Sequence, residues 1–168
     1  MRVHEFYLPI YEMLENVTPL KKDCGVLCDA ACCAETDERT GMLLFPYEEK
    51  MLANAGFDIE ESNCEYGEDK TAKILFCEGD CDRRFRPLAC RIFPLMPYKK
   101  PGGELEIIMN PAAKGMCPLA RSLEVSQLEP EFIKAVTRAM NRVLKLKDGE
   151  DYIYMLSEVA DDILKFVK

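Results

Sequence analysis

The clustering of cysteines into short runs constrains this chain more than any other feature. The densest stretch, residues 77 to 94, reads CEGDCDRRFRPLACRIFP, and an upstream run from residue 24 to residue 33 reads CGVLCDAACC. A further cysteine follows in a GMCP turn. Such short spacings let several thiolates point at a common centre, as a metal knuckle requires. The sequence therefore predicts thiolate metal binding, with the ligands Cys24, Cys28, Cys32, Cys33, Cys77, Cys81, Cys90 and Cys117.

The spacing leaves the metal and the number of sites open. Structural zinc is usually held by about four ligands in a tetrahedron, and thiolates also hold iron–sulfur clusters, so the eight thiols could supply two sites. His4 is the single histidine, which disfavours a mixed Cys/His site. Because neighbouring side chains diverge, we expect Cys32 and Cys33 not to share one tetrahedral ion; one would bind a second metal, bridge two metals or stay unbound. The expected cofactor is a zinc ion, with an iron–sulfur cluster as the alternative.

A purely structural alternative is that the cysteines are reduced, buried and behave as small hydrophobic residues. The number of close pairs makes this the weaker interpretation. Cys64 differs from the others because it has no near partner in the sequence. We expect Cys64 to be a surface thiol that binds no metal.

Composition disfavours a secreted protein held together by disulfides. The chain has 168 residues, of which 48% are hydrophobic, so one domain can bury a core without covalent cross-links. Nine cysteines also leave one unpaired in any complete disulfide scheme. The N-terminal segment is too charged for a signal peptide, and no run approaches the length of a membrane span. We expect a cytoplasmic protein with no membrane partner, in which clustered thiols indicate metal or redox chemistry.

The net charge of −8 disfavours nucleic acid as a general partner, because most of the surface repels a phosphate backbone. A local basic patch lies inside the cysteine-rich stretch, at Arg83, Arg84, Arg86 and Arg91. Guanidinium groups there would offset the negative charge of a metal–thiolate centre, and the alternative role is a clamp for a substrate carboxylate or phosphate. The expected partner is a metal ion, with another protein as a further candidate.

Hydrophobic periodicity predicts a single α+β domain over residues 1–168. Residues 1–121 would form a small cysteine-rich core of short strands and turns around the thiolate metal site or sites, with peripheral helices. Residues 122–168 would form an antiparallel helical pair. Glu48 and Glu49 would lie in the first turn of a helix, where carboxylates favour the helix dipole. The expected elements are helices over 6–17, 46–55, 130–144 and 152–167, strands over 42–45, 73–76 and 104–109, and an exposed loop over 58–70.

One longer pattern, C-x4-RPxxCRxFP, is formed by Cys81, Arg86, Pro87, Cys90, Arg91, Phe93 and Pro94. It resembles the pattern of the CxxCxxCC family, a family described as chelating zinc or iron and related to flagellin lysine N-methylase. The run from Cys24 to Cys33 resembles the opening cysteine run of that family, and residues 45–49 (FPYEE) resemble the helix entry that follows it. Cys77 and Cys117 fit the remaining cysteine positions. This chain differs in the wider spacing C-x3-C-x3-CC, and in Asp82 and Arg83, where the family usually has an apolar and an aromatic residue.

Three kinds of function are compatible with these patterns. The first is a metal-binding protein of unassigned activity, and the second, implied by the resemblance, is a cluster-dependent transferase similar to lysine N-methylase. The third is an electron carrier or redox sensor. No glycine-rich nucleotide loop follows a predicted strand, and the C-x3-C-x2-C pattern of radical enzymes is not met. We therefore rank metal binding above any particular reaction.

Overall fold

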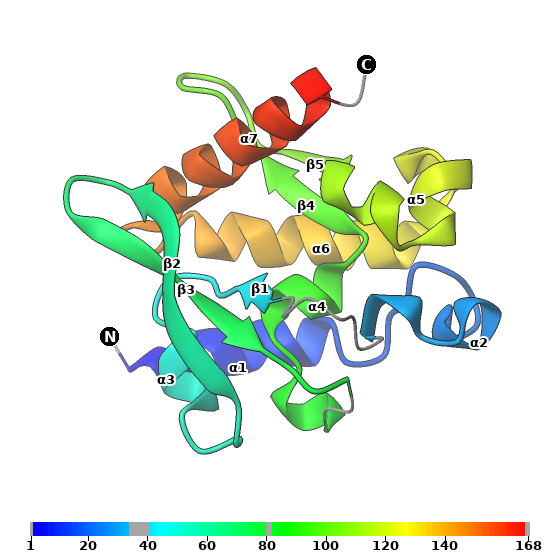
Figure 1. The fold of residues 1–168 in the computed structure, drawn as a ribbon, viewed down its shortest axis with the longest axis horizontal. Coiled ribbons are helices and arrows are strands. Elements are labelled where there is room, and N and C mark those ends of the chain that lie inside the picture. Colours follow the sequence, from blue (N-terminus) through cyan, green and yellow to red (C-terminus); the bar gives the residue numbers. More distant parts are fainter. Residues whose placement is uncertain (1, 34–40, 80–81, 167–168) are drawn as a thin grey trace.

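Helices and two small antiparallel sheets make up the protein in a computed structural model that describes residues 2–33, 41–79 and 82–166 (Figure 1). The predicted α+β class is confirmed. The helices are α1 (Val3–Met13), α2 (Gly25–Cys28), α3 (Glu49–Leu52), α4 (Leu88–Ile92), α5 (Pro118–Ser122), α6 (Pro130–Val143) and α7 (Gly149–Phe166). Short 3-10 turns lie at η1 (Ala31–Cys33), η2 (Arg83–Phe85), η3 (Pro111–Gly115) and η4 (Val125–Gln127). The strands are β1 (Gly41–Leu43), β2 (Asp58–Tyr66), β3 (Lys70–Phe76), β4 (Leu95–Tyr98) and β5 (Glu106–Met109).

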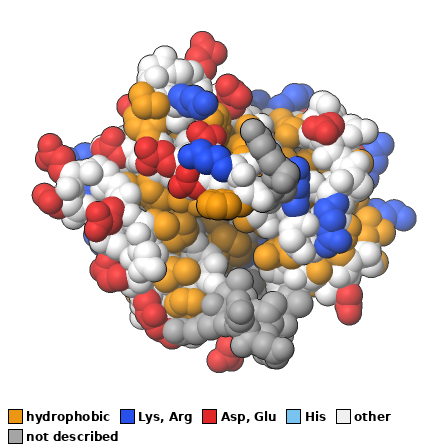
Figure 2. Space-filling view, turned by 45° about the horizontal axis from the view of Figure 1, so that its top comes forward, with side chains coloured by type: hydrophobic (Ala, Val, Ile, Leu, Met, Phe, Trp, Pro, Cys, Tyr) orange, Lys and Arg blue, Asp and Glu red, His pale blue; other side chains and the backbone are white. Residues whose placement is uncertain are grey.

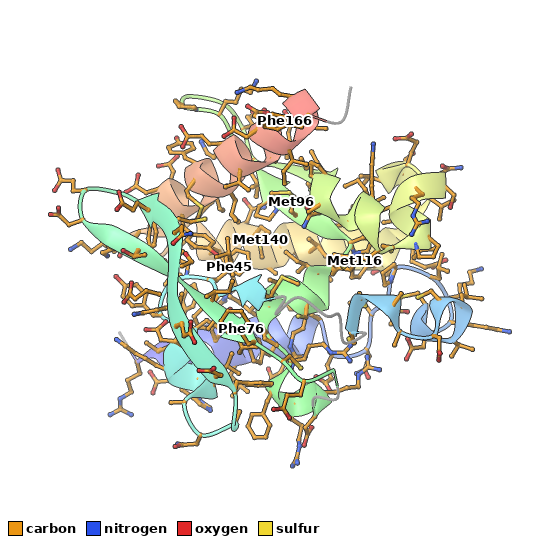
Figure 3. The ribbon with its side chains drawn as sticks, viewed as in Figure 1. Phe45, Phe76, Met96, Met116, Met140 and Phe166 are labelled. Carbon is orange, nitrogen blue, oxygen red and sulfur yellow. The ribbon has the colours of Figure 1, made fainter. Side chains whose placement is uncertain are left out.

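The amphipathic helix α6 runs through the middle of the molecule (Figure 1). It begins at Pro130. Proline is favoured in the first turn of a helix because an N–H there would make no hydrogen bond within the helix. The apolar residues of α6 recur on one face. That face buries Phe132, Ala135, Val136, Ala139, Met140 and Val143. Residues of α1, α4, β4 and α7 join them in the main hydrophobic core, and Figure 3 shows Met140 and Phe45 near its centre.

The predicted C-terminal helical pair is present as α6 and α7, which run in roughly opposite directions and diverge from the loop that joins them (Figure 1). This loop is tight: a Cβ on Gly149 would lie 1.9 Å from the carbonyl oxygen of Val143, so glycine is required. Both helices pack on the cysteine-rich part of the chain, since α6 contacts α1 and β5 while α7 contacts β2 and β4. Residues 1–121 and 122–168 therefore share one hydrophobic core.

The larger sheet has the strand order β1–β3–β2 with antiparallel neighbours. Its strand β2 corrects the prediction of an exposed loop over residues 58–70. The prediction was wrong because β2 is an edge strand rich in acidic residues, so its polar composition hides the pattern of a strand. Cys64 lies on β2 and is half-buried against the main core, which corrects the expectation of a surface thiol.

The surface divides by charge. Acidic side chains gather on the left of the face in Figure 2, which is the side of the β2–β3 hairpin in Figure 1. Strand β2 alone contributes Asp58, Glu60, Glu61 and Glu65. Within the described part of the chain, no helix combines the length and the apolar character needed to cross a bilayer.

Helix α3 is shorter than the helix predicted over residues 46–55. Tyr47 has a φ of +68°, a left-handed conformation that cannot continue into an α-helix, so α3 begins only at Glu49. The Tyr47 hydroxyl accepts a hydrogen bond from Lys70 Nζ at 3.0 Å and donates one to Asp148. Lys70 and Asp148 also form an ion pair, so this cluster links β3 to the start of α7.

The other elements lie near their predicted positions, with one omission. Helix α1 begins earlier than predicted and includes Pro9, while β1, β3 and β5 overlap the predicted strands. The sequence did not indicate β4, which pairs with β5 and contains Pro97 opposite Ile107. Proline lacks the N–H that a strand donates, so its presence argues against a strand in sequence-based reasoning.

Two buried tyrosines of the core differ in the partner of their hydroxyl group. The Tyr7 hydroxyl donates to the Pro46 carbonyl oxygen at 2.7 Å, whereas the Tyr152 hydroxyl has no hydrogen-bond partner among the described residues. We expect Tyr152→Phe to raise the free energy of unfolding by about 1 kcal/mol, because it removes an unsatisfied buried group. Tyr7→Phe should lower it by about 1–2 kcal/mol, because the Pro46 carbonyl then loses its partner. Urea denaturation measures the change in the free energy of unfolding for each variant. A loss of stability in Tyr152→Phe would contradict the prediction.

Candidate metal centre

Three cysteine-bearing stretches that are far apart in the sequence surround one cavity of about 430 Å³. Helix α2 and the turn η1 line one part of it, the stretch from η2 to α4 a second, and the start of α5 a third. In Figure 1, α2 and α5 lie on the same side of the molecule, opposite the tip of the β2–β3 hairpin. The cysteines that line this cavity are Cys24, Cys28, Cys32, Cys33, Cys90 and Cys117.

The two remaining predicted ligands belong to the stretch between β3 and η2. Cys77 directly follows β3, is exposed, and is not among the residues that line the cavity. Cys81 lies outside the described residues. The structure therefore places six of the eight predicted ligands on the lining of one cavity.

Local backbone geometry directs the first cysteine run toward the cavity. Asp23 accepts a hydrogen bond from the backbone N–H of Gly25 at 3.0 Å, and the single helical turn of α2 follows. Asp29 and Ala30 then both take a left-handed conformation, with φ of 51°. Two such residues in succession reverse the chain, so the turn η1 carries Cys32 and Cys33 back to the cavity that Cys24 and Cys28 already line.

The adjacent pair Cys32 and Cys33 differs from its predicted arrangement. We expected neighbouring side chains to diverge, yet the two Sγ atoms lie 4.0 Å apart. A 3-10 turn makes this approach possible, because it places successive side chains about 120° apart rather than on opposite faces as in a strand. A zinc–sulfur bond of about 2.3 Å gives a tetrahedral edge of about 3.8 Å, so the observed separation is close to that of two ligands of one ion.

The electrostatics of the cavity couple thiols from different stretches. Burial raises the pKa of Cys24, and the nearby Asp23, Cys28 and Cys117 raise it further. The hydrogen bond between Cys32 and Cys33 lowers the pKa of Cys33 to about 6, with a further contribution from the Arg86 guanidinium, and it raises the pKa of Cys32. A bound cation would favour the ionised form of Cys24, which the neighbouring Asp23, Cys28 and Cys117 oppose.

The donor chemistry of the cavity fits a thiophilic metal, since thiolates are the preferred ligands of zinc and of iron–sulfur clusters. The thiols surround the cavity rather than meeting at one point. Among the residues that the structure describes, no three Cys, His, Asp or Glu side chains are close enough together to hold a metal ion. Metal binding would therefore draw the surrounding loops inward.

The four arginines of the predicted patch differ in their surroundings. Arg91 is a structural residue: its side chain is only 5% exposed, stacks 4.2 Å from the Tyr11 ring and donates to the carbonyl oxygens of Arg83 and Arg86. Arg84 is exposed and pairs with Asp82. Arg83, Arg86 and Arg91 line the cavity, and the Arg86 guanidinium helps to lower the pKa of Cys33.

Glu48 is a buried carboxylate whose position the sequence did not predict. Its side chain is 0% exposed and accepts three hydrogen bonds, from the Tyr11 hydroxyl at 2.6 Å, the Phe45 N–H at 3.0 Å and the Leu88 N–H at 2.6 Å. We expected a helix-dipole role in the first turn of a helix, but Glu48 precedes α3 and points into the core.

Comparison with known proteins adds no relative, since no protein-family model, curated protein or solved structure matches this chain. The interpretation of the cavity therefore depends on its residues and their placement.

The buried Glu48 predicts a pH dependence of stability. Burial raises the pKa of Glu48 above its ordinary value of 4.5, and the hydrogen bonds from Tyr11, Leu88 and Phe45 oppose this shift. A raised folded-state pKa means that the contribution of Glu48 is fully present below the unfolded-state pKa and is lost as the pH rises through the folded-state value. The free energy of unfolding of wild type minus that of Glu48→Gln should therefore decrease as the pH rises from the ordinary carboxyl pKa of 4.5 toward neutrality. Denaturation across this range tests it, and a difference that increases with pH would mean that the hydrogen bonds outweigh burial.

Proposed function

We propose that this chain is a metal-binding protein whose cysteine thiolates hold a zinc ion, or alternatively an iron–sulfur cluster, in the cavity between α2, α4 and α5. The observation that supports it is the meeting of six cysteines from three separate stretches around one cavity. A role as hydrophobic core residues fits Cys117, which is buried beside Ala113 and Ala120. It explains the other five poorly, because Cys24, Cys28, Cys33 and Cys90 are only half-buried and Cys32 is exposed. Such thiols persist in a reducing compartment, so we propose a cytoplasmic location.

We further propose kinship with the CxxCxxCC family. The part of the pattern that includes Cys90, Arg91, Phe93 and Pro94 lines the same cavity as the opening cysteine run. Two motifs that are separated by about fifty residues in the sequence are thus neighbours in space, as a shared metal site would require. A protein partner stays a prediction from the sequence alone.

A second candidate function is a cluster-dependent transferase similar to lysine N-methylase. The observation that favours it is the size of the cavity, because about 430 Å³ falls within the range of small-molecule sites and exceeds what a metal ion fills. Arg83 and Arg86 on its lining offer guanidinium groups to an anionic ligand. Saturable binding of S-adenosylmethionine to metal-loaded protein would support this candidate, and its absence would remove it.

The metal and acid-labile sulfide content of untagged protein, purified without oxygen, tests the main proposal. Zinc without sulfide would support a structural or partner-binding module. Iron with matching sulfide would support a cluster protein, for which a reversible reduction potential would indicate electron transfer or redox sensing. Protein that takes up neither metal under reducing conditions would contradict the proposal.

Serine substitutions test whether the distant cysteines act together. We expect Cys90→Ser and Cys117→Ser each to lower the bound metal per chain and the melting temperature, because each removes a thiolate from the same centre. Cys64→Ser is the matched control, since Cys64 lies on β2 away from the cavity lining and should keep its metal. Metal analysis and thermal denaturation provide the two measurements. Full metal content in both Cys90→Ser and Cys117→Ser would exclude a shared site.

A further inference from the structure

We propose that Glu48 is a positioning residue for the candidate metal centre: it holds α4, and with it Cys90, in place opposite the first cysteine run. This inference depends on the proposed metal-binding function. Glu48 does not line the cavity itself, so its effect would be transmitted through the residues that it binds.

The first contact of this network holds the start of α4. The Glu48 carboxylate accepts the backbone N–H of Leu88 at 2.6 Å, and Leu88 is the first residue of α4. A helix of five residues has little stability of its own, so contacts outside it fix its position. Cys90 follows Leu88 by two residues on this short helix. A shift of the helix start would therefore move the Cys90 thiol.

The second contact joins α4 to α1. The same Oε1 atom of Glu48 accepts a hydrogen bond from the Tyr11 hydroxyl at 2.6 Å. The Arg91 guanidinium stacks over the Tyr11 ring, 4.2 Å from its centre. Arg91 in turn donates to the carbonyl oxygens of Arg83 and Arg86 at 2.7 and 2.8 Å. One chain of contacts thus runs from the buried carboxylate through α1 to the η2 stretch, which borders the cavity.

The third contact fixes Glu48 itself. Its Oε2 atom accepts the Phe45 N–H at 3.0 Å, and Phe45 is buried in the main core against Tyr152. Because the carboxylate is held from this side, it can act as a fixed point for the start of α4. A carboxylate suits this role because its two oxygens accept hydrogen bonds only, and all three neighbours are donors.

Glu48→Gln tests this role because glutamine keeps only one acceptor oxygen. The Tyr11 hydroxyl and the Leu88 N–H share one oxygen of Glu48 and the Phe45 N–H uses the other, so the amide loses either the Phe45 contact or the contacts with Tyr11 and Leu88. In metal-free protein under conditions where it stays folded, we expect iodoacetamide to alkylate Cys90 about five- to tenfold faster than in wild type, because α4 opens locally more often. The alkylation rate of Cys117, which belongs to another stretch, should stay unchanged. Peptide mass spectrometry after timed quenching measures both rates in one sample.

Two matched variants support the test. Glu49→Gln removes the neighbouring carboxylate and should react as wild type does, because the hydrogen bonds from Leu88 and Tyr11 go to Glu48. Tyr11→Phe removes one hydrogen bond to Glu48 but keeps the ring under Arg91, so it should accelerate the alkylation of Cys90 less than Glu48→Gln does. If Glu48→Gln does not fold, Tyr11→Phe replaces it in the test. In zinc-loaded protein, transfer of zinc to a chelator should be faster in Glu48→Gln by a similar factor.

The outcomes separate this inference from the proposed function. An equal acceleration at Cys90 and Cys117 would show a general loss of stability and overturn the positioning role. Unchanged Cys90 reactivity and zinc transfer, in variants of a wild type that binds zinc, would overturn it while leaving metal binding intact. A wild type that binds no metal would refute the proposed function. The alkylation rates of Cys90 and Cys117 in wild type and Glu48→Gln would still show whether Glu48 holds Cys90 in place.

Discussion

The burial of the Glu48 carboxylate among three hydrogen-bond donors is the interaction on which the arrangement of the metal-free chain most depends. It joins three segments that the sequence keeps apart: α1 through Tyr11, the turn after β1 through Phe45, and α4 through Leu88. A buried carboxylate without such partners would cost several kcal/mol, so these segments must meet for the core to form. Their meeting also places one wall of the cysteine-lined cavity.

The opposite wall of the cavity has little packing of its own. In α2, Val26 and Leu27 are 84% and 70% exposed, and the turn η1 that follows is half-buried or exposed throughout. Local hydrogen bonds and two left-handed residues shape this run, but no large apolar surface holds it against the domain. Metal–thiolate bonds would supply the missing stabilisation, as they do in small metal-binding modules. The contrast between a well-packed helical core and a weakly packed cysteine run thus agrees with the proposed function.

Sequence patterns predicted the regular parts of this fold. The periodicity of α6 and α7 was sufficient to locate both helices because each buries one continuous apolar face. Six of the eight cysteines that the short spacings singled out line one cavity, and metal binding by them stays a prediction. Strand β2 was missed because an acidic edge strand looks like a loop, and β4 because Pro97 argues against a strand. Glu48 could not be found because its role arises from long-range contacts with α1 and α4, and no local pattern indicates them.

Mapping which cysteines a bound metal protects from alkylation tests most directly that distant stretches form one centre. Protein would be titrated with zinc, alkylated, digested and analysed by mass spectrometry. The account predicts that Cys24, Cys28, Cys90 and Cys117 become protected together, in proportion to the zinc added, while the reactivity of Cys64 does not change. Protection confined to the run from Cys24 to Cys33, with Cys90 and Cys117 reacting as in metal-free protein, would contradict a shared centre.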